Sequence, residues 1–160
     1  GSEYGLFLSD GQITWSVHLN GRYVNVTPAQ RVSLNEWHHI AGVFDGNAVR
    51  VYLDGEQMGA KPGSGDRKTN ALPLVIGGDV NRNGVGTSMF RGQLDEVRLS
   101  TVARYAGQSF KPSRRFKSDD ATALLLHFDG FVGPWLFDSS KAGAHAKVVG
   151  DAKLVPLDAR

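Results

Sequence analysis

One stretch of alternating side chains, residues 35–58, most strongly limits what this chain can fold into. Apolar and polar residues follow each other with a period of two, which is typical of half-buried β-strands. Two tight-turn signals, Asp45-Gly46-Asn47 and Asp54-Gly55, interrupt the alternation. Glycine tolerates positive φ, and Asp and Asn bond their own backbone in turns. The stretch therefore predicts a three-strand antiparallel meander and an all-β chain.

The rest of the chain has the same character. Asn20-Gly21, the strongest hairpin dipeptide, separates two alternating segments before the meander. The strands predicted outside the meander are Tyr4–Ser9, Gln12–Leu19, Arg22–Thr27, 72–77, 88–100 and 121–128, followed by a last hairpin of 145–149 with 153–155. A single helical turn is expected at 101–106, and the glycine-rich segments 78–86 and 129–143 are expected to be loops.

The segment 88–100 is predicted to be the longest strand, with one irregularity. Its apolar residues change parity between Leu94 and Val97. A regular strand cannot bury both sets on one face, because successive side chains point to opposite sides. We therefore expect a β-bulge near Asp95-Glu96 that changes the direction of the chain.

Apolar residues on the inward parity predict a core between two packed sheets. They are Ile13, Trp15, Val17, Trp37, Val43, Val49, Val51, Leu53, Leu94, Val97, Leu99 and Leu126.

Composition excludes several classes of function. The 160 residues predict one domain over 3–160, after a Gly1-Ser2 pair typical of a cleaved purification tag. The net charge of +2 is too small to indicate a nucleic-acid partner. The apolar runs are shorter than the roughly 18 residues of a membrane span, so we expect no membrane insertion. We expect a monomeric module.

Two motifs resemble a known family. The first is Asn-Glu-Trp-His-His-Ile-Ala-Gly-Val-Phe-Asp-Gly at 35–46, followed by Val-Arg-Val-Tyr-Leu-Asp-Gly-Glu at 49–56. The second is Phe-Arg-Gly-Gln-Leu-Asp-Glu-Val-Arg-Leu-Ser at 90–100, followed by Ala103-Arg104-Tyr105. Together they resemble the laminin G-like, concanavalin A-like jelly-roll domains of secreted multidomain proteins. The resemblance implies an antiparallel two-sheet β-sandwich and a secreted or cell-surface location.

The order of the family-like segments is unusual. Residues 126–130 and 137–145 resemble the first strand and first loop of such a domain, yet they lie near the C-terminus. A circular permutation, in which the tail supplies first-strand-like elements, is one explanation, because the termini of sandwiches usually lie close together. The alternative is that the tail begins a second domain. We favour the permutation, because the apolar strand around Leu124 would otherwise be an exposed edge.

Catalysis is the weaker expectation. Retaining glycoside hydrolases with this fold carry both acids in a Glu-x-Asp-x-(x)-Glu run, and the sequence has none. Asp95 and Glu96 are neighbours, so their side chains point to opposite faces of a regular strand. The sequence also lacks cysteine and a Gly-x-Ser-x-Gly elbow. We therefore predict a non-enzyme, and a hydrolase with an unfamiliar acid pair is the least favoured alternative.

A structural calcium ion is implied by the resemblance. Related domains often hold one Ca²⁺ between the first-strand loop and an acid of the last strand, which correspond here to Asp129 with the Gly130 carbonyl and to Asp95. Asp138 could assist, since Ca²⁺ takes six to eight oxygen ligands. The alternative is that Asp95 pairs with an arginine such as Arg98, while Asp129 and Asp138 cap turns.

Sugar binding would need exposed rings and polar groups. Trp135 and Phe131 lie in a glycine-containing segment and form either a platform or a plug over the core. Two tyrosines lie on the outward parity, and an asparagine-rich loop offers hydrogen bonds. The predicted ligand-binding residues are therefore Trp135, Phe131, Tyr52, Tyr23, Asn81, Arg82 and Asn83.

The sequence thus predicts a non-catalytic module that binds a glycan. The rival interpretation is a structural or protein-adhesion domain without a sugar site, which would have a flat apolar patch and a buried Trp135.

Overall fold

The computed structural model describes residues 3–155, so the Gly1-Ser2 pair lies outside the described residues. The predicted all-β, antiparallel fold is confirmed, because the described residues contain strands and no helix. They accordingly include no helix that could cross a membrane. The chain divides into two compact units: a head unit, up to Arg91 with Ala103–Pro112, and a tail unit, Gly92–Val102 with Ser113 onward.

The first sheet of the head unit is formed by β1 (Tyr4–Ser9), β2 (Gln12–Leu19) and β3 (Arg22–Val26), in that order. All neighbours are antiparallel, and Leu19 pairs with Arg22 across the turn. Asn20 and Gly21 have φ of 46° and 81°. Two positive φ angles are the requirement of a type I′ turn, whose twist matches that of the strands it joins. The predicted hairpin is confirmed.

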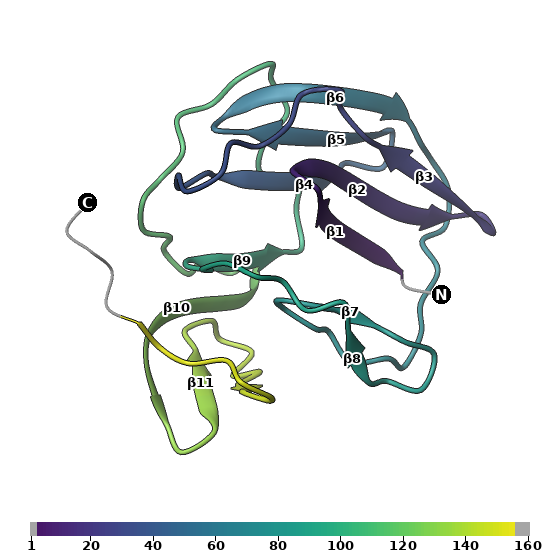
Figure 1. Cartoon of the computed structure of the whole chain (residues 1–160). Helices are drawn as coiled ribbons and strands as arrows, with labels where there is room; N and C mark the ends of the chain where they lie inside the picture. Colours follow the sequence, from purple (N-terminus) through teal and green to yellow (C-terminus); the bar gives the residue numbers. More distant parts are fainter. Residues whose placement is uncertain (1–2, 156–160) are drawn as a thin grey trace. The chain divides into compact units, whose positions relative to one another are not determined.

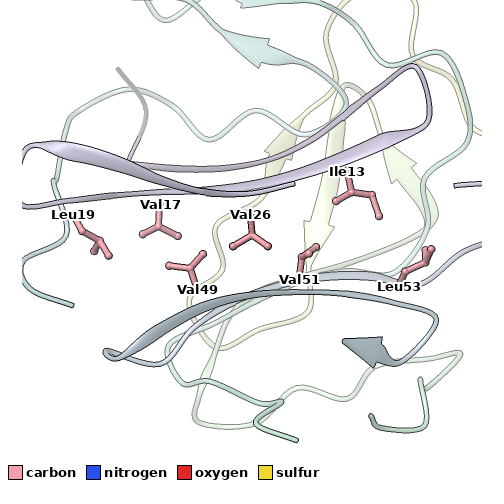
Figure 2. Packing of buried hydrophobic residues seen from close by; sticks show 7 residues of the cluster. All are labelled: Ile13, Val17, Leu19, Val26, Val49, Val51 and Leu53. Carbon is pink, nitrogen blue, oxygen red and sulfur yellow. The ribbon is translucent and has the colours of Figure 1, made fainter. Parts of the chain in front are cut away.

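The predicted meander forms the second sheet of the head unit. Its strands are β4 (Ile40–Phe44), β5 (Ala48–Leu53) and β6 (Glu56–Pro62). The two sheets are drawn as two layers in Figure 1. Figure 2 shows the core between them, with side chains from both layers pointing toward one another. This core consists of Ile13, Val17, Leu19 and Val26 from the first sheet and Val49, Val51 and Leu53 from the second.

The predicted core is correct for the alternating strands of the head unit. Val97, Leu99 and Leu126 belong to the tail unit instead, where Val97 and Leu99 are half-buried. Two further positions are wrong because they are exposed. Trp37 is 46% exposed and Leu94 is 39% exposed. Both lie outside the strands, in segments where alternation does not determine which side is buried. Trp15 is half-buried over β4, where its indole Nε1 donates a hydrogen bond to the Val43 carbonyl at 3.1 Å. Gly42 leaves room for this ring, because a Cβ there would lie 2.3 Å from Trp15.

The segment 103–110 covers the outer face of the second sheet. Tyr52, which alternates with the core residues Val51 and Leu53, is fully buried beneath it. Its ring contacts Tyr105 and Phe110 at centroid distances of 6.0 and 5.4 Å, and those two rings stack on each other at 3.6 Å. The expectation that Tyr52 is exposed and binds ligand is therefore wrong. Alternation shows that its side chain points away from the core between the sheets, but it does not show whether another segment covers that outer face.

Tyr52→Phe should destabilise the protein modestly while leaving its fold intact. The phenol of the buried Tyr52 donates to the Gly107 carbonyl at 2.9 Å, and phenylalanine removes this donor. The loss of one such hydrogen bond costs about 1 kcal/mol. Urea unfolding of the two proteins measures this difference. An unchanged midpoint would contradict the assigned role of the hydroxyl.

The segment that follows the meander, residues 72–100, differs from expectation. Residues 72–77 do not form a strand, and the Asn-rich loop closes a small hairpin of β7 (Asp79–Val80) and β8 (Gly86–Thr87). The predicted long strand 88–100 is also wrong, since only β9 (Val97–Ser100) forms within it. Glu96 immediately before β9 has a φ of 52°. The predicted β-bulge near Asp95-Glu96 is also wrong, because these residues precede the strand and Glu96 takes a left-handed backbone conformation there.

The tail unit is one antiparallel sheet in the order β12-β11-β10-β9. Its longest strand is β10 (Thr122–Val132), which is followed by β11 (Trp135–Asp138) and β12 (Ala146–Lys147). Leu124, Leu125 and Leu126 of β10 are buried. The helical turn expected at 101–106 is absent from this structure, and so is the predicted hairpin, since β12 pairs with β11 instead of 153–155.

Strand β10 pairs with β9 over Leu124–Leu126, opposite Val97–Leu99. The tail therefore adds strands next to an element that carries the second family-like motif. Both strands belong to the tail unit, so the permutation and the second-domain interpretation both stay predictions.

Candidate functional site

The first candidate site is an aromatic face on the β10–β11 hairpin. It is defined by Val132, Trp135 and Phe137, which are 67%, 44% and 51% exposed. Val132 is paired with Trp135 across the strands, and Phe137 follows Trp135 by two residues, so all three share one side of the sheet. The segment expected to be a loop is thus a hairpin, whose turn Gly133 permits with a φ of 57°. Figure 1 shows this hairpin as the long β10 followed by β11.

Phe131 lies on the opposite side of the same hairpin. It pairs with Leu136 and is 42% exposed. Trp135 and Phe131 were predicted to act together, yet neighbouring register positions place them on different faces. The partner of Trp135 is Phe137, which sequence reasoning missed. Its signal was present in the sequence, because Trp135 and Phe137 have the spacing of one strand face.

Asp138 holds the loop that supports Phe137. Its carboxylate is buried and accepts hydrogen bonds from the backbone N–H of Leu125, Ser140 and Ala144 at 2.8, 2.8 and 2.9 Å, and from the Ser140 hydroxyl at 2.6 Å. Burial alone would raise the pKa of Asp138, but these hydrogen bonds outweigh it and lower the pKa. The same loop brings His145 edge-on to Phe137, with a centroid distance of 5.0 Å.

Charged groups next to β10 are paired with each other. Arg115 Nη2 lies 2.6 Å from Asp129 Oδ2, and this hydrogen bond is the main reason that the pKa of Asp129 is lowered. Glu96, whose side chain is 10% exposed, accepts a hydrogen bond from the Phe116 N–H at 2.8 Å. The Glu96 carboxylate also lies 2.8 Å from His127 Nδ1.

These pairings do not fit the predicted calcium site of Asp95, Asp129, Gly130 and Asp138. The Asp129 carboxylate is already bound to a guanidinium, and the Asp138 oxygens are occupied by loop donors. Within residues 3–155, no group of three or more acidic or histidine side chains is arranged to hold a metal ion. The alternative in which Asp138 caps a turn describes its contacts, and Asp129 is the acid that pairs with an arginine.

The second candidate site is an open hollow in the head unit, of about 610 Å³. It lies beside the β2–β3 turn, where the segment 64–68 runs against the end of β2. We call it the basic hollow, and its lining residues are His18, Asn20, Gly21, Asp66, Arg67 and Lys68. Tyr23, one of the predicted ligand-binding residues, is 44% exposed and contacts the His18 ring edge-on at 4.6 Å.

The remaining predicted residues lie on the β7–β8 hairpin. Asn81 is half-buried, and its side-chain oxygen accepts hydrogen bonds from the N–H groups of Asn83 and Val85 at 2.9 and 3.1 Å. The side-chain oxygen of Asn81 therefore stabilises the turn between β7 and β8. Arg82 and Asn83 are exposed at the tip. The structure thus distributes the predicted ligand-binding residues over four places: the β10–β11 hairpin, the buried position of Tyr52, the β2–β3 hairpin with Tyr23, and the β7–β8 hairpin.

Comparison with known proteins identifies the family. Residues 1–108 match the model of the concanavalin A-like lectin/glucanases superfamily, of laminin G type. This chain is a member of that superfamily. No curated protein and no solved structure matches it significantly. The superfamily match includes the whole basic hollow and strand β9, whereas the aromatic face of this concanavalin A-like chain lies beyond residue 108.

Proposed function

We propose that this concanavalin A-like chain is a non-catalytic module of a secreted or cell-surface protein, and that it binds a glycan on its aromatic face. One observation carries the proposal: Trp135 and Phe137 present two half-exposed rings on one side of one strand. Their positions are about 6.6 Å apart along the strand, so the rings can contact successive parts of one chain.

Carbohydrates suit such a surface for a physical reason. The two faces of a pyranose carry C–H groups that stack on aromatic rings, while its hydroxyls remain available to water and to polar neighbours. Lys147 is paired with Trp135 on β12, which places a polar side chain at the rim of the rings. The exposure of Trp135 also supports a glycan over the rival protein-adhesion hypothesis, which expected this residue to be buried.

The contacts made by three carboxylates of the tail unit favour a binding role over hydrolysis. A glycosidase needs one free carboxylate and one carboxylic acid flanking the substrate. In the tail unit, Asp129 is paired with Arg115, Glu96 with His127, and Asp138 with its own loop. These contacts engage the three carboxylates in holding the fold, which supports a module that binds without cleaving.

Trp135→Ala should abolish most of the affinity for the preferred polysaccharide. An exposed ring at the centre of a small site is expected to contribute about 2 kcal/mol, which corresponds to roughly a 30-fold loss. Affinity electrophoresis through gels containing a panel of neutral and acidic polysaccharides measures the retardation of each variant. Phe137→Ala should give a similar loss.

The matched control is Phe131→Ala, which removes an equally exposed ring from the other side of the same hairpin. Its retardation should equal that of the unchanged protein. Equal losses in the Phe131 and Trp135 variants would overturn the assignment of the face. A protein that no polysaccharide retards would overturn glycan binding here and favour protein adhesion.

A further inference from the structure

We propose that Ser33 is an activated nucleophile, which takes the acyl group from an ester of a small carboxylic acid such as acetate. Its hydroxyl Oγ lies 2.8 Å from Nε2 of His38, and Nδ1 of the same ring lies 2.7 Å from Oδ2 of Asp54. A serine, a histidine and an aspartate in this order are recognised by their geometry and not by their sequence positions. The site belongs to the head unit and goes beyond the proposed glycan binding.

Asp54 determines which nitrogen of His38 can act as a base. An ionised carboxylate only accepts hydrogen bonds, so His38 Nδ1 carries the proton between the two side chains. In a neutral imidazole the other nitrogen, Nε2, is then an acceptor, and it faces the Ser33 hydroxyl. A base that contacts the nucleophile and is itself oriented by a third group is the arrangement that activates a serine.

The fold holds this arrangement in place. Asp54 lies in the tight turn between β5 and β6, with a φ of 51°. Its Oδ1 accepts the His39 N–H at 2.8 Å, and its own N–H donates to the His39 carbonyl at 2.8 Å. The His38 side chain is 14% exposed, whereas Ser33 is exposed. An acyl donor in solution can therefore reach the hydroxyl, while the base is largely shielded from water.

Glu36 competes with His38 for the hydroxyl proton. Its Oε2 lies 2.6 Å from Ser33 Oγ, and a serine hydroxyl has a single proton to donate. The Glu36 side chain is 68% exposed and lies in the same loop. Its removal leaves His38 as the acceptor, so this residue gives the proposal a direct test.

The transfer balances with the groups that are present. Ser33 Oγ attacks the carbonyl carbon of the ester while its proton moves to His38 Nε2. The ester carbon–oxygen bond then breaks, and the leaving alcohol oxygen takes that proton from His38. The products are O-acylated Ser33 and one free alcohol. One transfer per molecule is a modification, which is compatible with a module that turns over no substrate.

Backbone donors lie next to the nucleophile in the sequence. The N–H groups of Leu34, Asn35 and Glu36 have no hydrogen-bond partner within residues 3–155. Asn35 has a φ of 61°, and turns that contain such a residue can direct successive N–H groups toward one anion. These groups are therefore available to the negative charge that develops on the carbonyl oxygen during the attack.

Labelling of the full chain with p-nitrophenyl acetate, followed by trypsin digestion and mass spectrometry, tests the proposal. Cleavage after Arg31 and after Arg50 releases the peptide 32–50. Ser33 is the only serine in this peptide, which contains no threonine, tyrosine or lysine. A stable acetyl group on this peptide is therefore assigned to Ser33, and we expect one per molecule.

The same digest contains an internal control. Peptide 83–91 carries two exposed hydroxyls, Thr87 and Ser88, and neither contacts a histidine in the part of the chain that the structure describes. Its labelling should be at least tenfold lower than that of 32–50, because a positioned base accelerates proton transfer by at least that factor.

Three variants assign the roles. Ser33→Ala should remove the label from 32–50. His38→Ala should slow its formation about a hundredfold, which is the low end of general-base catalysis. Glu36→Ala is the matched control from the same loop and should be labelled at least as fast as the unchanged protein. The urea unfolding midpoint of each variant shows whether its fold is retained.

Equal labelling of the two peptides in the unchanged protein would overturn the proposal, and this comparison needs no variant. An unchanged rate in a folded His38→Ala protein would overturn it too. So would loss of the label in Glu36→Ala, since Glu36 would then be the acceptor of the proton. Trp135→Ala should be labelled normally, so failure of this site is distinguishable from failure of glycan binding on the aromatic face.

Discussion

Replacing Gly55 by alanine should destabilise the head unit by more than about 3 kcal/mol, a class of effect that single substitutions reach only through a specific structural conflict. Gly55 has a φ of 91°, and a Cβ built there would lie 2.0 Å from the Phe110 carbonyl oxygen. The obstacle is backbone, which cannot rotate away. Phe110 N–H also donates to the Gly55 carbonyl at 2.9 Å. The new methyl group would therefore displace the segment that covers Tyr52.

Gly46→Ala is the matched control for this experiment. Gly46 has nearly the same φ, 92°, in the other turn of the meander, and an added Cβ would meet nothing within 4 Å. Only the left-handed conformation is then penalised, at roughly 1–2 kcal/mol. Urea or thermal unfolding of both variants measures the difference. Equal destabilisation would show that the contact with the Phe110 segment does not support the sheet.

Asp138→Ala should cost the tail unit about 3–4 kcal/mol, which is the second of the two largest effects. The substitution leaves several donors without their acceptor, and the Leu125 N–H is fully buried. Each unsatisfied buried donor costs about 1–3 kcal/mol. The contrasting variant is Asp129→Ala, which removes a 59% exposed side chain from a surface ion pair and should leave the melting temperature nearly unchanged.

The pH dependence of the same variant gives an independent measurement. The folded protein lowers the pKa of Asp138 below its unfolded value of about 3.8. The unfolded chain therefore binds a proton at higher pH than the folded chain does. The stability that Asp138 contributes is fully present above pH 4 or so and is lost as the pH falls through the folded pKa. Unfolding of Asp138→Ala should lack this acid-dependent component, and an identical acid profile in both proteins would contradict the assignment.

Local pattern predicted most of the head unit. Alternation and turn dipeptides are short-range properties, so β2, β3 and the meander follow from neighbouring residues such as Asn20 and Gly21. Tyr52 shows where this reasoning ends. Alternation along the strand predicted that its side chain points away from the core. Its burial depends on Tyr105 and Phe110, which follow more than fifty residues later. No periodicity in the chain encodes which distant segment covers an outer face.

The candidate sites were less predictable for the same reason. Trp135 was correctly singled out as unusual, but its loop is a hairpin, and register with β10 decides that Phe137 and not Phe131 shares its face. The basic hollow was missed altogether. Arg67 and Lys68 look like ordinary loop cations in the sequence, and only the bridge between Leu19 and Arg67 places them beside His18. The spacing of residues within a motif does not predict which segments about fifty residues apart will pair.

The chain passes between its two units three times, and this interweaving matters for anyone transplanting the module. A fragment cut at residue 108, where the family match stops, retains β9 but discards its hydrogen-bonded neighbour β10. It also discards Phe110, which packs against Tyr52 and donates a backbone hydrogen bond to Gly55. Such a fragment would expose the unpaired backbone N–H and C=O groups of β9, which are a template for self-association. A workable excision boundary therefore lies beyond the family border, after the β11–β12 pair.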